Sequence, residues 1–205
     1  SIFGAKKVNL SGCSQNCPAH VDVPEYLACI REGNLDGAAA ILMESNPIPA
    51  ITSRVCTHFC QMNCKRAEFD EHVNIGGMER YVGDYILDNA DRFMKAPEAE
   101  SGKKTAIVGS GPAGLTAAYY LRRLGHQVLV YDKMEEAGGL LRYAIPEYRL
   151  PKDIVKKLIS ALEAMGIQFK TGTEIGRDIP VSDLVEQFDS VFLNTGAWKR
   201  PLIGL

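Results

Sequence analysis

The amino-acid sequence predicts an α-helical domain over residues 1–97, followed by an α/β domain of the Rossmann type over residues 98–205. Three observations predict this architecture. All six cysteines lie before residue 65, among short stretches with helical patterns. A strand, a glycine-rich turn, a helix and a second strand follow one another between residues 104 and 133. The polar segment APEAESGK, residues 96–103, separates the two regions and has the composition of a linker.

The composition restricts the classes of protein to which the chain can belong. Its 205 residues suffice for one or two domains, and its 46% apolar content is typical of globular proteins. The net charge of −2 and the pI of about 6.1 give no electrostatic reason to expect nucleic-acid binding. No apolar run is long enough to span a membrane, and the absence of an apolar signal core favours a cytoplasmic location.

The helical region begins with two recognisable helices. One is predicted from its cap at Asp22 to about Glu32, and a second, rich in alanine, over residues 35–44. Further along, residues 74–77 predict a turn. Residues 78–93 then have the pattern of an amphipathic helix.

The segment from Lys104 to Lys133 has the order and spacing of a dinucleotide-binding βαβ unit. Gly109, Gly111 and Gly114 form a G-x-G-x-x-G pattern directly after a buried strand. The first glycine permits a tight turn, the second lets a diphosphate approach the backbone, and the third lets helix and strand pack. The helix that follows presents free N–H groups and a positive dipole end to the phosphates.

Two further residues support nucleotide binding. Pro112 suits the first helical turn, because the N–H group that it lacks would have no helical partner there. Asp132 ends the second strand, residues 127–131, where a carboxylate accepts hydrogen bonds from ribose hydroxyls and repels the 2′-phosphate of NADP. These features favour a nucleotide site over an ordinary strand-turn-helix.

The rest of the α/β region predicts the remaining parts of a parallel sheet. A helix is expected over residues 154–165, a strand over 167–170, part of a short helix over 184–187 and a buried strand over 190–193. Thr195-Gly196 would lie at the carboxyl end of the last strand, where open parallel sheets bind ligands.

Five thiols of the helical region are clustered along the chain and predict a metal centre. They are Cys13, Cys17, Cys56, Cys60 and Cys64, whereas Cys29 lies inside a predicted helix and is interpreted as a core residue. In a chain with no signal peptide, such clustering favours metal over disulfides. Zinc, with His20, His58 or His72 as a ligand, remains an alternative, although the C-x2-C pairs usual for zinc are absent. Iron–sulfur ligation is favoured, because thiols beside a redox nucleotide domain can relay electrons.

The last three thiols allow two local structures. At a spacing of four residues they would share one face of a helix, with some drift. A turn-rich loop could equally fold them round a cluster.

Six segments together resemble one family of proteins. They are CPAHVDVPEYL, RVC with the two cysteines that follow it, NIGGMERYVGDY, VGSGPAGLTAAYYL, GGLLRYAIPEYRLPKDI and NTGAWKRP. The chain resembles the small, beta subunit of bacterial glutamate synthase, the amino-terminal part of dihydropyrimidine dehydrogenase and the large subunit of NADH-dependent ferredoxin:NADP oxidoreductase. The resemblance covers nearly the whole chain. It implies a helical domain with two 4Fe–4S clusters, followed by an FAD domain and an NAD(P)H domain.

The resemblance implies a ligand set for one cluster. Cys17, Cys56 and Cys60 would hold it together with Glu79, a carboxylate in place of a fourth thiolate. Such a ligand would change the charge and covalency of the cluster, and thereby its potential.

The second cluster of the family is left open. Cys13 and Cys64 match two of its ligands, but the other two cysteines would fall near Ala5 and Val8, and neither of these is cysteine. A second cluster is therefore either absent or completed from elsewhere, or these thiols are idle. A single cluster that uses Cys13 or Cys64 in place of Glu79 is a further alternative.

The resemblance also implies that the glycine turn binds FAD. The implied contacts are Gly109, Ser110, Gly111, Pro112, Ala113, Gly114, Asp132, Lys133, Gly139, Leu140, Arg149, Ile175, Thr195 and Gly196. Asp132 stands where the family more often has glutamate. No catalytic side chain is expected, because the isoalloxazine ring performs the chemistry.

The implied function is that of an FAD and iron–sulfur oxidoreductase. The chain would be an electron-transfer flavoprotein module that relays electrons between FAD and 4Fe–4S clusters, beside other iron–sulfur or flavin subunits of a complex. The sequence has no second G-x-G-x-x-G, so NAD(P)H would bind a domain not present in this chain. The FAD-binding domain is accordingly expected to be incomplete, and the chain a fragment or a subunit. The alternative is a non-catalytic assembly module that docks a larger iron–sulfur oxidoreductase.

Overall fold

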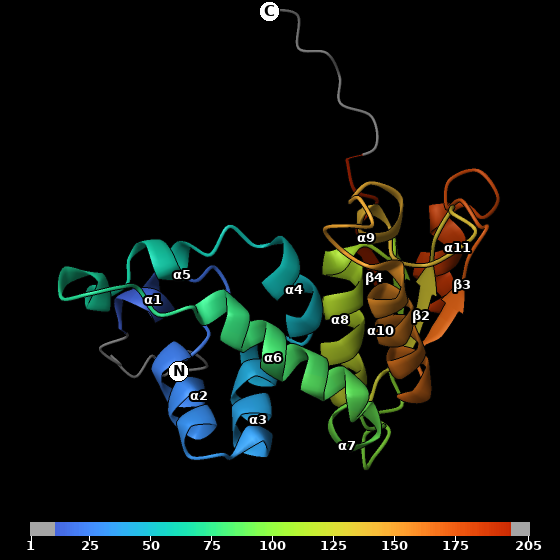
Figure 1. Cartoon of the computed structure of the whole chain (residues 1–205). Coiled ribbons are helices and arrows are strands. Elements are labelled where there is room, and N and C mark those ends of the chain that lie inside the picture. The colour runs from blue at the N-terminus through green and yellow to red at the C-terminus, as the bar shows by residue number, and fades with distance from the viewer. Residues whose placement is uncertain (1–10, 198–205) are drawn as a thin grey trace, which may run out of the picture. The chain divides into compact units, whose positions relative to one another are not determined.

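The computed structural model divides into two compact units, and it describes residues 11–197 (Figure 1). The first unit ends at Asp88 and the second begins at Asn89. The polar segment 96–103 therefore belongs to the second unit. There the Glu100 carboxylate pairs with the Arg122 guanidinium, and the backbone N–H of Ser101 donates to a backbone carbonyl 2.9 Å away.

The first unit consists of short helices. They are α1 (Gly12–Gln15), α2 (Val23–Arg31), α3 (Leu35–Ser45), α4 (Pro49–Val55), α5 (Phe59–Met62), the 3₁₀ helix η1 (Lys65–Glu68) and α6 (Ile75–Asp88). Side chains cap α1, α2 and α3, since Ser11, Asp22 and Asn34 each accept from the backbone N–H three residues on. The two helices predicted before residue 45 are confirmed.

Helix α6 packs closely against α4 in this unit. The Arg54 guanidinium makes two bonds to the Asp84 carboxylate, at 2.7 and 2.9 Å. The backbones also approach closely, because a Cβ on Gly83 would lie 2.5 Å from the backbone nitrogen of Ala50. Around this contact the large side chains with under 2% exposure include Tyr26, Leu42, Ile51, Ile75 and Ile86.

The turn predicted over residues 74–77 is wrong. Helix α6 already begins at Ile75, and Asn74 caps it, since its Oδ1 accepts from the backbone N–H of Gly77 at 3.0 Å. Asparagine and glycine favour both turns and the first turn of a helix, so this segment was ambiguous. The predicted helix also ends early, at Asp88, and a separate turn of helix, α7 (Ala90–Phe93), follows.

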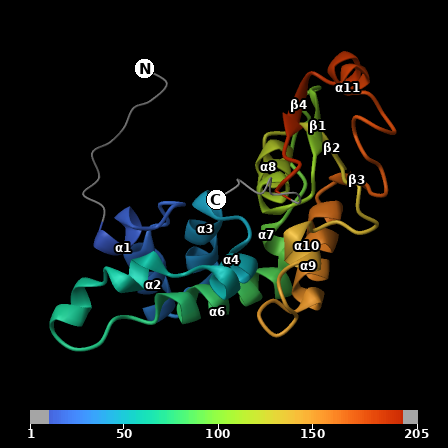
Figure 2. The ribbon, with the colours of Figure 1, turned by 90° about the horizontal axis from the view of Figure 1, so that it is seen from above.

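The second unit contains a parallel sheet with the strand order β3-β2-β1-β4. Its elements after α7 are β1 (Lys104–Val108), α8 (Pro112–Arg123), β2 (Gln127–Tyr131), α9 (Leu140–Tyr143), α10 (Lys152–Ala164), β3 (Gln168–Lys170), α11 (Val181–Gln187) and β4 (Ser190–Leu193). Figure 2 shows the strands side by side, and α8 packs against β1 and β2. The predicted βαβ unit and the later helices and strands are confirmed. No helix between residues 11 and 197 has the length and apolar character needed to cross a membrane.

Strand β4 differs from its prediction in burial. It pairs with β1 at the edge of the sheet, with Val108 opposite Leu193. Phe192 is 42% exposed and Leu193 is 59% exposed, so the prediction of a buried strand is wrong. An apolar run indicates a strand, but whether a second strand or a helix covers it depends on tertiary pairing.

Helix α9 was not predicted from the sequence. It lies directly after Gly139, and the Lys152 side chain supports it by donating to the backbone carbonyls of Leu141 and Ile145. A contact between residues 11 apart in the chain leaves no local signal in the sequence.

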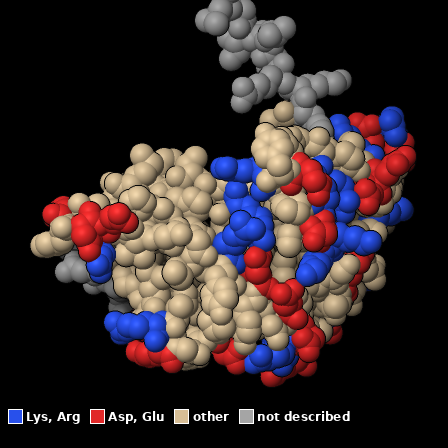
Figure 3. All heavy atoms as spheres, in the orientation of Figure 1, with Lys and Arg blue, Asp and Glu red and all other residues tan. Residues whose placement is uncertain are grey.

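Charged side chains are distributed over the surface. On the face drawn in Figure 3, basic and acidic residues lie interspersed over the second unit, whereas much of the face of the first unit carries no charge. This pattern agrees with the small net charge of −2.

Replacing Gly83 by alanine tests the packing of α6 on α4. The added methyl group would overlap the α4 backbone, so Gly83→Ala should lower the free energy of unfolding by about 1–3 kcal/mol. Chemical denaturation followed by circular dichroism measures this change. The control is Tyr81→Ala on the exposed face of the same helix, where the side chain is 55% exposed and a loss under about 1 kcal/mol is expected. Equal losses in the two variants would contradict the close packing.

Candidate functional site

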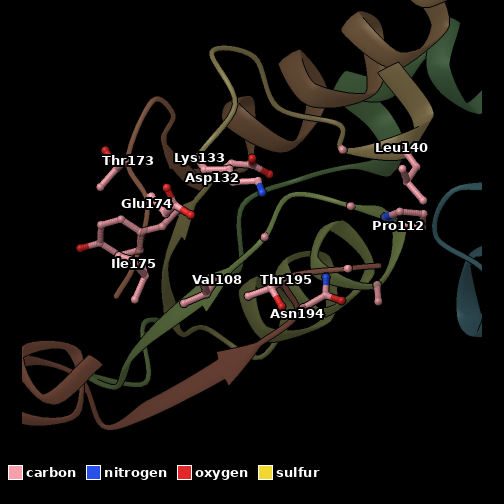
Figure 4. Close-up of a pocket in the computed structure, with 16 residues that line it drawn as sticks. Val108, Pro112, Asp132, Lys133, Leu140, Thr173, Glu174, Ile175, Asn194 and Thr195 are labelled. Atoms are coloured by element: carbon pink, nitrogen blue, oxygen red, sulfur yellow. The ribbon is translucent and has the colours of Figure 1, made fainter. Parts of the chain in front are cut away.

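A cavity of about 310 Å³ opens at the carboxyl ends of the parallel strands (Figure 4). Thr173, Glu174 and Ile175 lie at one end of it, and Pro112 and Leu140 lie at the other. Between them the segments that leave β1, β2 and β4 form the walls. This is the position at which open parallel sheets bind their ligands.

The first glycine turn allows three backbone segments to meet beside this cavity. Gly109 has a positive φ of 109°, and a Cβ there would lie 2.0 Å from the backbone oxygen of Asn194. A Cβ on Gly114 would lie 2.0 Å from the backbone oxygen of Gly109. Side chains at these two positions are therefore excluded by the fold itself, with or without a ligand.

Gly111 has a different role, because it faces the open cavity. A Cβ on this residue would meet no atom within 4 Å, and its φ of −70° suits any residue. It is the N-cap of the 12-residue helix α8, and no side chain caps the free N–H groups of the first turn. These groups and the helix dipole favour an anion at this end of the cavity.

A second glycine loop lies against the first. Gly138 and Gly139 both have positive φ, 128° and 51°, and a Cβ on Gly139 would lie 3.0 Å from the Cα of Gly111. The two loops thus bring bare backbone from two directions to one place. Such an arrangement is suited to a diphosphate, which is recognised by backbone N–H groups.

Asp132 lines the cavity and is held in place by the turn. Its Oδ2 accepts from the backbone N–H of Ser110 at 2.8 Å and from the Ser110 hydroxyl, and its Oδ1 accepts from the N–H of Met134 at 2.9 Å. The Ser110 hydroxyl in turn accepts from the N–H of Gly138 at 3.0 Å. Ser110 is completely buried, whereas Asp132 keeps 9% of its surface exposed.

Most of the predicted contact residues do line the cavity. They are Gly109, Gly111, Pro112, Ala113, Asp132, Lys133, Gly139, Leu140, Ile175, Thr195 and Gly196. Ser110 and Gly114 do not, because both are buried behind the turn, and Arg149 is exposed in a separate turn after Pro146.

Five lining residues were missed by the site prediction: Val108, Tyr131, Thr173, Glu174 and Asn194. Val108 and Tyr131 end β1 and β2, Asn194 follows β4, and the other two follow β3. The rule that ligands bind beyond the carboxyl ends of parallel strands would have indicated them.

The thiols of the first unit lie on a turn-rich segment. Cys56 ends α4, Cys60 lies in α5 and Cys64 precedes η1. The shared helix face is therefore wrong, and the alternative of a turn-rich loop is confirmed. Cys13 lies in α1, which packs against α5, and Cys17 follows α1 closely.

Cys60 and Glu79 form the buried part of this thiol region. Burial, together with negative charge on Cys17, Glu79 and Cys56, raises the pKa of the Cys60 thiol to about 11, against a backbone hydrogen bond at Gln61 that lowers it. Burial also raises the pKa of Glu79, against the hydrogen bonds that its Oε1 accepts from Thr52 at 2.8 Å and Asn46 at 3.0 Å. These residues are close enough to influence one another electrostatically, although no metal-binding group of three or more His, Cys, Asp or Glu is already assembled within residues 11–197.

His58 connects two parts of this region. It has a left-handed backbone with φ of 55°, and its N–H donates to the Cys56 sulfur at 3.2 Å. Its imidazole packs on the first turn of α6, where a Cβ on Gly76 would lie 2.3 Å from Nε2. Gly76 also donates its N–H to the Gln61 side chain at 2.7 Å. The thiol segment is thereby held against the helix that carries Glu79.

The donor chemistry of this region fits an iron–sulfur cluster. Thiolates and carboxylates are donors that iron accepts, and N–H groups of Asn46 and His58 already bond the Glu79 carboxylate and the Cys56 sulfur. Cys13 contacts the Ser11 hydroxyl at 3.0 Å, and Cys64 directly precedes η1.

Comparison with known proteins identifies the relatives of this chain. Over 192 residues it is 41% identical to the small chain of the NADPH glutamate synthase of Bacillus subtilis. The match covers 94% of this chain and 39% of that protein. The chain is a homologue of glutamate synthase small chains. This chain is also 38% identical to the beta subunit of an NADPH-Fe(3+) oxidoreductase of Geobacter sulfurreducens. That match covers 94% of this chain and 29% of the relative.

A third relative is the beta subunit of the NADP(+)-dependent formate dehydrogenase of Moorella thermoacetica, at 36% identity over 94% of the chain and 30% of the relative. This chain thus spans between 29% and 39% of the length of these three proteins.

Two family models match separate parts of this chain. Residues 7–91 match the dihydropyrimidine dehydrogenase domain II with a 4Fe-4S cluster, and residues 107–162 match an NAD(P)-binding Rossmann-like domain. These matches confirm the predicted order of an iron–sulfur domain and a Rossmann-like domain. Among solved structures, FprA of Mycobacterium tuberculosis in complex with NADPH matches with a TM-score of 0.46 at 23% sequence identity. The match covers 50% of this chain and 24% of FprA, and this similarity is too low to indicate a function.

Replacing Gly111 by valine tests whether the cavity binds a nucleotide diphosphate. Because a Cβ at this position meets no atom within 4 Å and the residue faces the cavity, Gly111→Val should fold normally, but the valine would occupy the place of the phosphates. The affinity for ADP, measured by isothermal titration calorimetry, should fall by about tenfold or more. The control is Ala99→Val, an exposed substitution before β1. Unchanged ADP binding by Gly111→Val would place the nucleotide elsewhere.

Proposed function

We propose that this chain is the flavin and iron–sulfur module of an NAD(P)H-linked oxidoreductase. The observation that carries the proposal is the contact between the two glycine loops, Gly111 and Gly139, at the uncapped amino end of α8. A dinucleotide diphosphate fits this arrangement, and relatives of the chain are oxidoreductase subunits. We assign FAD to the cavity.

The residues of the cavity have separate tasks toward FAD. The free N–H groups at the start of α8 bind the phosphates, and Asp132 binds the adenosine ribose. Ile175 and Leu140 provide apolar surface at the two ends of the cavity. Two carboxylates, Asp132 and Glu174, line the same space and would repel the 2′-phosphate of NADP. When bound, FAD supplies hydride exchange with a nicotinamide and one-electron exchange with an iron–sulfur centre.

The thiol region would hold a 4Fe–4S cluster through Cys17, Cys56, Cys60 and Glu79. Cys60 must lose its proton when it binds iron, because only the thiolate is a ligand. The amide of Asn46 and the hydroxyl of Thr52 orient the Glu79 carboxylate. Cys13 and Cys64 remain candidate ligands of a second cluster. The family's other two ligands would fall near Ala5 and Val8, and these positions lie outside the described residues.

The partners proposed for this module follow from its relatives. These are subunits of an NADPH-Fe(3+) oxidoreductase, a formate dehydrogenase and a glutamate synthase. We therefore assign this chain to a cytoplasmic complex with other iron–sulfur or flavin subunits, and the use of NAD(P)H to that complex.

Anaerobic purification tests the cofactor content. Iron, acid-labile sulfide and flavin should all be present, and Cys56→Ser should lose iron because it removes a thiolate ligand. The matched control is Cys29→Ser, since Cys29 lies within α2 and is not among the proposed ligands. Flavin without iron would refute the cluster, and equal iron in the two variants would refute Cys56 as a ligand.

Glu79→Gln tests the carboxylate ligand. The amide oxygen of glutamine can still accept from Asn46 and Thr52, so the variant removes the negative charge with little change in shape. The electron paramagnetic resonance spectrum and the midpoint potential of the reduced cluster should both change. Glu25→Gln, at an exposed position of α2, serves as the control. A spectrum and a potential identical to those of the wild type would exclude Glu79 as a ligand.

A further inference from the structure

We infer that Asp132 accepts a hydrogen bond from a single ribose hydroxyl, through Oδ1, and that Ser110 imposes this limit as a positioning residue. The inference rests on the proposed nucleotide site. It concerns how the site reads the ribose, and not which cofactor occupies it.

The limit follows from counting the acceptor positions of the carboxylate. The two oxygens of an ionised carboxylate offer about four lone-pair sites in total. Oδ2 uses both of its sites, for the backbone N–H of Ser110 and for the Ser110 hydroxyl. Oδ1 uses one site for the N–H of Met134. One acceptor site on Oδ1 is left for a ligand in the cavity that Asp132 lines.

The direction of each hydrogen bond around Ser110 is fixed by chemistry. The backbone N–H of Gly138 can only donate, so the Ser110 oxygen accepts from it at 3.0 Å. The carboxylate can only accept, so the single proton of the Ser110 hydroxyl points at Oδ2. The hydroxyl therefore has no rotational freedom to release Oδ2 for a second ribose hydroxyl.

The surroundings of Ser110 support a positioning role. Its side chain is completely buried and does not line the cavity, so it acts on a ligand only through the residues that it bonds. It joins Asp132, beside the ribose, to Gly138 of the second glycine loop, beside the phosphates. The hydroxyl thus fixes the two loops and the carboxylate with respect to one another.

The wild-type chain allows a direct test with ADP and its analogues. Displacement of FAD from the full chain is measured for ADP, 2′-deoxy-ADP, 3′-deoxy-ADP and 2′,3′-dideoxy-ADP. A charge-assisted hydrogen bond predicts that loss of one hydroxyl weakens binding by about 10- to 100-fold. Loss of the other hydroxyl should change binding by less than about threefold, and the dideoxy analogue should match the weaker single analogue.

Two results of this series would overturn the inference. Either each hydroxyl contributes about tenfold by itself, or neither contributes. Both leave FAD binding intact, so they leave the proposed function standing. If the wild-type chain bound neither FAD nor ADP, the proposed function would fail, and the inference with it.

Ser110→Ala tests the positioning role in the same assay. Without the hydroxyl, Oδ2 has a free acceptor site for the second ribose hydroxyl, so the ratio of the affinities for ADP and for the other single-deoxy analogue, less than about threefold in the wild type, should rise by about threefold or more. The matched control is Ser190→Ala, which removes a hydroxyl bonded to Thr105 at 2.8 Å on β4. If Ser110→Ala weakened both nucleotides equally and kept the ratio, Ser110 would be structural only, and its part of the inference would be wrong.

Discussion

The close approach of three backbone segments at the end of β1 is the constraint on which the α/β unit depends. Gly109 touches the chain that leaves β4, and Gly114 touches Gly109 itself, at distances that admit no side chain. Because of these contacts, α8 starts directly at the carboxyl end of the parallel strands with its free N–H groups toward the cavity. The same packing leaves Gly111 in open space. Two glycines are therefore required by the fold, whereas the fold itself leaves room for a side chain at the third.

Close backbone approach also shapes the thiol region of the helical unit. Gly83 lets α6 lie on α4, and Gly76 lets the His58 imidazole lie on the first turn of α6. These contacts hold the segment with Cys56 and Cys60 beside the helix that carries Glu79. In each unit, then, glycines in one helix or turn determine where the candidate ligand and site residues lie. The hydrogen bonds of Ser110 have the corresponding effect on Asp132.

Much of the α/β unit could be predicted because its signals are local. Glycine and proline mark the ends of β1 and α8, and the bounds of β2 and β4 agree with the predicted ones. The exposure of β4, the helix α9 and the inward position of Ser110 could not be predicted, since each depends on residues distant in the chain. Asn74 was ambiguous, because asparagine favours both turns and helix caps. Glu79 has no local signal at all, and only the resemblance to relatives indicated it.

Hydrogen–deuterium exchange of the full chain, with and without FAD, tests most directly whether a dinucleotide diphosphate lies over the glycine turn. Binding should slow the exchange of the backbone amides of residues 111, 113, 114 and 138–140, where the two glycine loops meet. Amides of η1, in the other unit, should exchange at an unchanged rate. Saturating FAD that left the glycine loops unprotected, or that protected a different part of the α/β unit, would contradict the assignment of this cavity.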